Sequence, residues 1–163
     1  MDKTIDLFYI LQTLGLTLVF VGLIGYERQK KHKIAGMTTH LMVAFGAAAL
    51  AIVQEYLYFD SIQLVIDTAQ TNPEVAASVT FERQRLIAQI VAGVGFLGTG
   101  AIIKTNGYIT GLTTASTLWI SAIIGIIFGL GFITLGISVS LFALLTLVII
   151  KRFFGPKFDK ENN

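Results

Sequence analysis

The sequence predicts an all-α membrane protein: a bundle of five transmembrane helices over residues 1–155, followed by a tail over residues 156–163. Two observations predict this class. The first is composition, because 54% of the 163 residues are hydrophobic and only 13% are charged, with a mean hydropathy of +0.74. Soluble domains carry about a quarter charged residues, so this chain has too few polar groups to cover a water-exposed surface.

The second observation is a series of apolar runs long enough to cross a bilayer. About 20 mostly apolar residues span the hydrocarbon core, and the runs cover residues 7–26, 37–57, 86–103, 112–128 and 132–150. The last two runs come from one apolar stretch too long for a single crossing, and Gly129 and Gly131 indicate the hairpin that divides it. The first run lacks the basic start and cleavage site of a signal peptide, so we expect it to remain as a helix.

The distribution of basic residues predicts the orientation. With five spans, the first loop, the third loop and the C-terminal tail share one side of the membrane and hold nine of the twelve Lys and Arg residues. The positive-inside rule places this side in the cytoplasm, so the N-terminus is expected outside and the C-terminus inside. Four or six spans would put the two basic clusters on opposite sides.

The long loop after the second span carries helical signals of its own. Apolar residues recur at helical spacing over residues 62–69, which predicts a short amphipathic helix on the membrane surface. Asn72 and Pro73 then predict a new helix start that leads into the third span.

Small and polar residues recur at helical spacing in four of the predicted spans. Such faces let helices approach closely, so we expect them to meet inside the bundle and the fifth span to lie at its periphery. The faces are Gln12, Gly15 and Gly22; His40, Ala44, Ala47 or Ala48, and Ala51; Ala88, Ala92, Gly95 and Thr99; and Thr110, Thr114, Thr117, Ser121 and Gly125.

The third span is rich in glycine, and Gly93 to Gly98 matches the pattern GxGxxG. A dinucleotide site would need a strand before this pattern and a βαβ unit around it, whereas a hydrophobic helix surrounds it here. Two interpretations remain: close helix packing, or a helix opened at its glycines so that backbone carbonyls face an ion.

Charged residues at the membrane borders are the candidates for chemistry. Glu27 and Arg28 lie at the end of the first span, beside a basic loop. They could form an interfacial ion pair or a functional site, and the sequence leaves both interpretations open. Glu82 and Arg85 lie three residues apart, a spacing that lets them pair. No metal site is assignable, although Glu27 and Glu82 are the carboxylates that could contribute to one. His40 is the only candidate base in a span, so we expect no enzyme, and the net charge of +2 gives no support for a nucleic-acid partner.

Three ordered blocks resemble the signature motifs of the MgtC/SapB membrane family. They are residues 25–29 (GYERQ) with 35–39 (AGMTT), residues 85–100 (RLIAQIVAGVGFLGTG), and residues 111–115 (GLTTA) followed by Trp119. The resemblance implies a bacterial inner-membrane protein with a five-helix domain, here a short member without the soluble C-terminal domain of many relatives. Its motif residues are the functional candidates: Glu27, Arg28, Gly36, Thr39, Glu82, Arg85, Gln89, Gly93, Gly95, Gly98, Gly100, Thr113, Thr114 and Trp119. Glu82 stands where the family usually has Asp, and Trp119, far from both membrane interfaces, indicates packing.

Two functions follow from this resemblance as expectations. One is a transporter of Mg²⁺ or another cation that serves magnesium homeostasis, with no cofactor beyond Mg²⁺ itself. The alternative is a non-transporting regulator that docks onto other membrane complexes. The expected partners are the lipid bilayer, further copies of the chain, or other membrane proteins.

Overall fold

The computed structural model describes residues 6–72, 74, 85–105 and 108–150, and these residues form helices joined by short turns and one hairpin. The helices are α1 (Leu7–Lys30), α2 (Met37–Thr71), α4 (Arg85–Gly100), α5 (Leu112–Gly129) and α6 (Ile133–Leu145), which a π-helical turn, η1 (Thr146–Ile150), continues. Strands β1 (Ile103–Thr105) and β2 (Tyr108–Thr110) pair antiparallel between α4 and α5.

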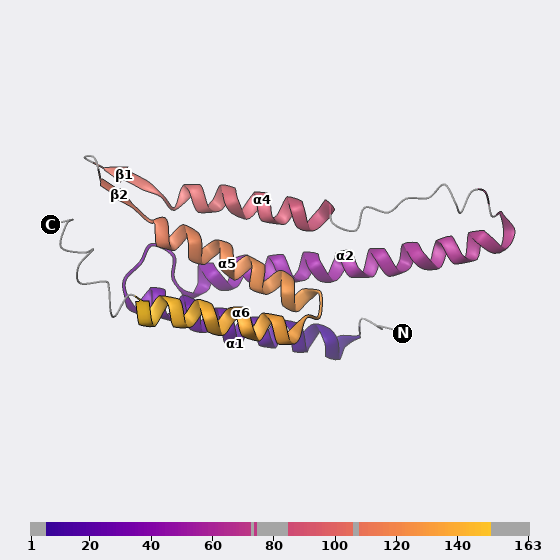
Figure 1. Ribbon diagram of the computed structural model, residues 1–163, viewed down its shortest axis with the longest axis horizontal. Coiled ribbons are helices and arrows are strands. Elements are labelled where there is room, and N and C mark those ends of the chain that lie inside the picture. The colour runs from indigo at the N-terminus through magenta and orange to yellow at the C-terminus, as the bar shows by residue number, and fades with distance from the viewer. Residues whose placement is uncertain (1–5, 73, 75–84, 106–107, 151–163) are drawn as a thin grey trace.

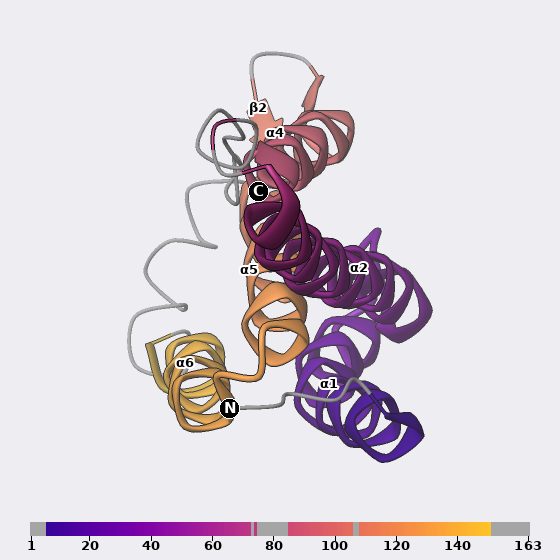
Figure 2. The same cartoon turned by 90° about the vertical axis from the view of Figure 1, so that its right-hand side faces the viewer.

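The helices lie side by side along one long axis, and the chain reverses direction from each to the next (Figure 1). The α1–α2 turn, the β1–β2 hairpin and the start of α5 lie together at one end, which we call the hairpin end. Seen along the axis, α5 occupies the middle of the bundle (Figure 2). It packs against α1, α2, α4 and α6, so the core lies around this helix.

Three of the described helices, α1, α2 and α5, are long and apolar enough to cross a membrane, and α4 and the α6–η1 segment are shorter apolar helices. Many of their large apolar side chains face outward: Leu7, Phe8, Met42, Phe96 and Phe142 are all exposed. Such a surface suits lipid rather than water, which agrees with the predicted class of an all-α membrane protein.

The helix boundaries correct two of the predictions. α2 is one unbroken helix of 35 residues, so the separate surface helix over residues 62–69 is wrong. No glycine or proline stands between residues 47 and 72 to end the helix. Asn72 instead ends α2, with its N–H donating to the Thr68 carbonyl, and the helix start predicted at Pro73 lies outside the described residues. α4 ends at Gly100, so the predicted third span runs past the helix and into β1.

The α5–α6 connection confirms the glycine hairpin. α5 ends at Gly129, and Gly131 has a φ of +80°, the left-handed conformation that glycine adopts most easily. Gly129 also lets two helices touch, since a Cβ there would lie 2.6 Å from the Ala48 carbonyl oxygen of α2.

The buried faces agree with the predictions in α2 and α5 but not in α1 and α4. In α1 the buried face is Thr13, Thr17, Val21, Ile24, Gly25 and Arg28, one position away from the predicted Gln12–Gly15–Gly22 face. In α4 it is Ile90, Val94 and Gly98, whereas Ala88, Ala92 and Thr99 are exposed and Gly95 is half-buried. Thr110 lies exposed in β2. In both helices larger side chains share the contact with one glycine, Gly25 in α1 and Gly98 in α4.

Candidate functional site

A close helix contact at the hairpin end builds the candidate site. A Cβ on Gly25 of α1 would lie 2.6 Å from the Met37 Cα, so only glycine lets α1 approach the first turn of α2 this closely. Arg28 follows Gly25 by about one helical turn and therefore points into the contact between α1, α2 and α5. Its side chain is only 1% exposed.

Arg28 makes one hydrogen bond and one ionic contact. Its Nη2 donates to Thr114 Oγ1 on α5 over 3.2 Å, and its Nη1 lies 3.8 Å from a Glu27 carboxylate oxygen. Nε and Nη1 are buried and have no hydrogen-bond partner among the residues that the structure describes. A buried guanidinium with unused donors is costly, and charged groups within membrane helices mark functional sites by default.

Glu27 lies between two cations. It forms an ion pair with Lys31, one turn later on α1, and faces Arg28 on its other side. Its side chain is 11% exposed. Oε1 is held in the ion pair with Lys31, and Oε2 is buried without a hydrogen bond from any described residue. The pair predicted at the membrane border is therefore part of a buried cluster, which we call the Arg28 cluster: Glu27, Arg28, His40, Thr114 and Thr117.

His40 connects the start of α2 to α5. Its Nδ1 lies 2.7 Å from the Gly36 carbonyl oxygen and its Nε2 lies 3.0 Å from Thr117 Oγ1. Since Nδ1 faces a carbonyl oxygen, it carries the proton and donates. The hydroxyl of Thr117 has one proton for two neighbours, Nε2 and the Thr114 carbonyl oxygen at 2.9 Å. Both ring nitrogens are therefore engaged in holding the two helices together.

Two helix N-termini add to the positive potential of the Arg28 cluster. α2 and α5 run in the same direction and both begin at the hairpin end (Figure 1). Neither start has a side-chain cap, although the Met37 N–H donates to Gln29 Oε1 over 3.2 Å. Unpaired N–H groups and the helix dipole make such ends positive.

The remaining predicted residues lie around the cluster or in a second region. Gly36 is the residue after which α2 begins, and Thr39 and Thr113 are exposed in the first turns of α2 and α5. Arg85 is the first residue of α4 and lies at the end of that helix far from the hairpin end, and Glu82 lies outside the described residues. The first and third family motifs therefore meet through Arg28 and Thr114, and the second contacts the third where Gly98 lies against Ala115.

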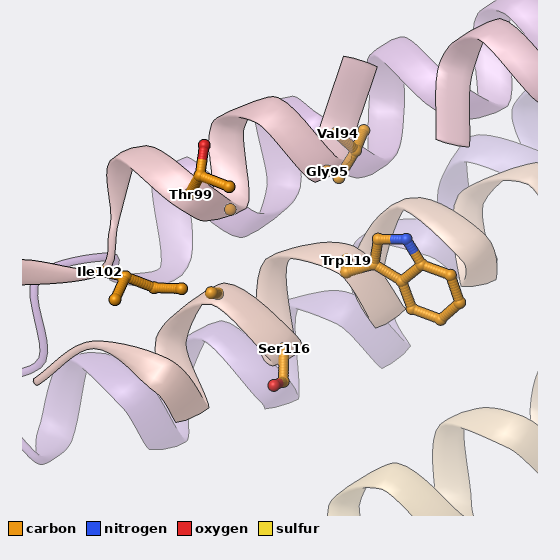
Figure 3. Close-up of a pocket in the computed structure, with 8 residues that line it drawn as sticks. Val94, Gly95, Thr99, Ile102, Ser116 and Trp119 are labelled. Carbon is orange, nitrogen blue, oxygen red and sulfur yellow. The ribbon is translucent and has the colours of Figure 1, made fainter. Parts of the chain in front are cut away.

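The second motif lines a groove between α4 and α5 of ≈ 310 Å³ (Figure 3). Gly95, Gly98 and Thr99 form one wall, and Ser116 and Trp119 of α5 form the other. Trp119 is 42% exposed and borders the groove, so the packing role expected for it stays a prediction. Gln89 and Gly100 are exposed on α4, and Gly93, also exposed, borders another groove, between α4 and α2.

α4 is a continuous α-helix through all of its glycines, so the opened helix considered from the sequence is wrong for this structure. Gly98 lies against α5, where a Cβ would be 3.6 Å from the Ala115 Cβ. Gly93, Gly95 and Gly100 face open space, because a Cβ added at any of them would meet no atom within 4 Å. Their small size therefore serves no contact within the described part of the chain.

A second buried polar group lies toward the other end, and the sequence reasoning missed it. Gln54 and Glu55 of α2 are both buried. Gln54 Oε1 accepts from the Ile87 N–H over 3.1 Å, and Tyr9 of α1 donates to the Gly129 carbonyl over 2.6 Å. Glu55 follows Ala51 by four residues, so it continues the small-residue face of α2. This spacing is the sequence signal that could have indicated a buried Glu55.

Among the described residues, no three His, Asp or Glu side chains come together as metal ligands would.

Together, the apolar helices and the charged cluster between them define an all-α membrane protein with an ionic site inside its helix bundle. Residues 14–155 match the family model of the MgtC family. The chain belongs to this family.

Individual relatives agree with the family match. The chain is 38% identical over 146 residues to "Putative magnesium transporter YhiD" of Escherichia coli (strain K12), an alignment that covers 90% of this chain and 62% of the relative. It is 40% identical over 113 residues to "Protein MgtC" of Brucella abortus (strain 2308), covering 69% and 39% respectively. It is 38% identical over 123 residues to "Protein MgtC" of Salmonella typhimurium (strain 14028s / SGSC 2262), covering 76% and 44%. The chain thus spans less than two thirds of the length of each relative. No solved structure gives a significant match.

Proposed function

We propose that the chain is a multi-pass protein of the bacterial inner membrane that moves Mg²⁺ or another cation in magnesium homeostasis, with the Arg28 cluster as its working site. The observation that carries the proposal is the buried Glu27–Arg28 pair, in which Arg28 Nε, Arg28 Nη1 and Glu27 Oε2 have no hydrogen-bond partner among the described residues. The similarity to a relative described as a putative magnesium transporter supports magnesium as the ion.

Five crossings fit the helix lengths. At a rise of 1.5 Å per residue, α4, with 16 residues, and the slightly longer segment Ile133–Ile149 are each about 25 Å long, close to the hydrocarbon thickness. The described helices alternate in direction (Figure 1). The basic residues of the α1–α2 loop favour the hairpin end as the cytoplasmic one, which places the start of α1 outside.

The charges around Glu27 favour a gate rather than a resident metal site. Mg²⁺ is bound by one or two carboxylates and keeps several waters, and Glu27 is the one carboxylate of the Arg28 cluster. Lys31 and Arg28 already neutralise it. A hydrated cation that reached Glu27 would compete with Lys31, so the ion pair would open as the cation passes and close after it.

Flux into proteoliposomes tests the proposal. Purified protein is reconstituted with a Mg²⁺-sensitive dye inside the vesicles, and an inward Mg²⁺ gradient is imposed. We expect protein-dependent Mg²⁺ entry that Glu27→Gln abolishes, because the substitution removes the only negative charge of the cluster while keeping its size. Lys104→Gln, an exposed charge at the same end, should leave the flux unchanged. Absence of flux for Mg²⁺ and for the other common cations would overturn the transport proposal.

The exposed face of α4 favours a second candidate, the regulator that docks onto another membrane protein. Ala88 and Ala92 are small, lie on one helical face and are exposed in the described part of the chain. Such faces suit close helix association in lipid. An Ala92→Leu variant that keeps ion flux but loses its effect on growth at low magnesium would favour this candidate.

A further inference from the structure

The first turn of α5 presents N–H groups that the helix itself does not pair, at exposed residues. The helix begins after Gly111 without a side-chain cap, and helix geometry leaves the N–H groups of its first turn without a partner inside the helix. Leu112 and Thr113 are both exposed. A helix N-terminus with free N–H groups attracts anions.

A buried cation lies directly against this turn. Arg28 donates from Nη2 to Thr114 Oγ1, three residues after the helix cap, while its Nε and Nη1 have no hydrogen-bond partner among the described residues. The guanidinium is almost completely buried and aimed at the first turn of α5. Guanidinium donors in this fork arrangement match the oxygens of a carboxylate or phosphate.

The charges near this turn do not balance. The carboxylate of Glu27 faces Arg28 at 3.8 Å but is also ion-paired with Lys31. Two cations thus face a single carboxylate, and the start of α5 beside Arg28 adds positive potential. An additional anion with several acceptor oxygens would satisfy the free donors and restore neutrality.

We propose that the first turn of α5 and the Arg28 guanidinium beside it form a binding site for a phosphate group, carried either by inorganic phosphate or by an anionic lipid. The site does not depend on ion transport and would exist equally in a regulator. For a lipid, the structure also offers a place for an acyl chain. A groove of ≈ 610 Å³ starts at Thr113 and runs between α5 and α6, lined mainly by apolar residues such as Leu135, Phe142 and Leu147.

Binding of radiolabelled inorganic phosphate to the detergent-purified chain tests one source. We expect saturable binding that Arg28→Gln weakens at least about tenfold, because a charged hydrogen-bond donor is lost. Glu27→Gln should tighten binding about three- to tenfold, since it removes the competing negative charge. The double variant Glu27→Gln/Arg28→Gln removes both buried charges, so it should fold and yet bind as weakly as Arg28→Gln. Lys104→Gln, which removes an exposed charge at the same end, is the matched control and should bind like the parent.

Native mass spectrometry of the same proteins with phosphatidylglycerol or phosphatidylcholine tests the other source. Retention of phosphatidylglycerol over phosphatidylcholine that depends on Arg28, without binding of free phosphate, would assign the site to a lipid headgroup. Binding of inorganic phosphate that depends on Arg28 would assign it to the free anion. If neither ligand binds, or if the double variant binds both as the parent does, the site does not exist.

Discussion

Arg28 on α1 and Thr114 on α5 are 86 residues apart in the chain, and a hydrogen bond of 3.2 Å from Nη2 to Oγ1 joins them. This contact brings the first and third motifs of the MgtC family into one buried cluster at the hairpin end. It also explains how a charged residue can lie inside an apolar bundle, since the hydroxyl and the neighbouring Glu27 replace part of its hydration.

Removal of one partner of the buried pair should destabilise the protein. We predict that Arg28→Ala lowers the free energy of unfolding by about 3–5 kcal/mol, because Glu27 stays buried while losing one of its two cations. The double variant Glu27→Gln/Arg28→Met should recover most of this loss. Thermal unfolding in a fixed detergent measures both, and a single variant as stable as the parent would show that the pair is not buried.

The close contact at Gly25 should not tolerate even a methyl group. We predict that Gly25→Ala destabilises the protein by about 1–3 kcal/mol, because the new Cβ would meet the Met37 backbone at 2.6 Å. Gly22→Ala is the matched control on the same helix, where nothing lies within 4 Å; it should be neutral or stabilise by up to about 1 kcal/mol. Equal effects of the two substitutions on the melting temperature would contradict the α1–α2 packing.

The hydrogen bond between Thr117 and His40 should contribute to stability. Thr117→Val keeps the shape of the side chain but leaves the buried Nε2 of His40 without its partner, so we predict a loss of about 1–3 kcal/mol. Ser116→Ala, at the neighbouring position of α5, should change the free energy of unfolding by less than about 0.5 kcal/mol. If Thr117→Val leaves the melting temperature unchanged, the Nε2 atom of the His40 imidazole has another hydrogen-bond partner.

The glycines of α4 should differ sharply in their tolerance of a large side chain. Gly98→Leu should push α4 away from Ala115 of α5 and lower the melting temperature. In Gly93→Leu the new side chain would extend into space where a Cβ meets no atom within 4 Å. This substitution should leave the melting temperature of the monomer unchanged. If Gly93→Leu instead disrupts an assembly that size-exclusion chromatography detects in the parent, this face of α4 is where another helix binds.

The sequence predicted the helices better than it predicted their contacts. Apolar runs and the glycines near residue 130 indicated α1, α5 and α6 closely, because length and turn chemistry are local properties. The end of α2 was missed, since a fall in hydropathy after Leu57 does not stop a helix that has no glycine or proline until Pro73. Helical spacing alone could not tell which of two adjacent faces of α1 is buried, because that depends on α2 and α5.

The candidate site could be predicted only in part. Glu27, Arg28 and Thr114 were named from the motifs, yet no local pattern shows that residues 28 and 114 touch. His40 and Thr117 were expected as packing residues, and the structure makes them hydrogen-bond partners. Glu55 was overlooked because it falls where the apolar run ends, although its spacing from Ala51 continues the buried face of α2.

Cysteine accessibility tests most directly whether the bundle crosses a membrane with the Arg28 cluster at its cytoplasmic end. The chain contains no native cysteine, so single cysteines can be introduced at exposed positions. Cysteines at Ile34 and Lys104 report on the hairpin end, and cysteines at Gln63 and Phe132 report on the other end. We predict that a membrane-impermeant maleimide added to intact cells labels Gln63→Cys and Phe132→Cys but labels Ile34→Cys and Lys104→Cys only after the membrane is opened. Labelling of all four in intact cells, or of the opposite pair, would contradict this topology.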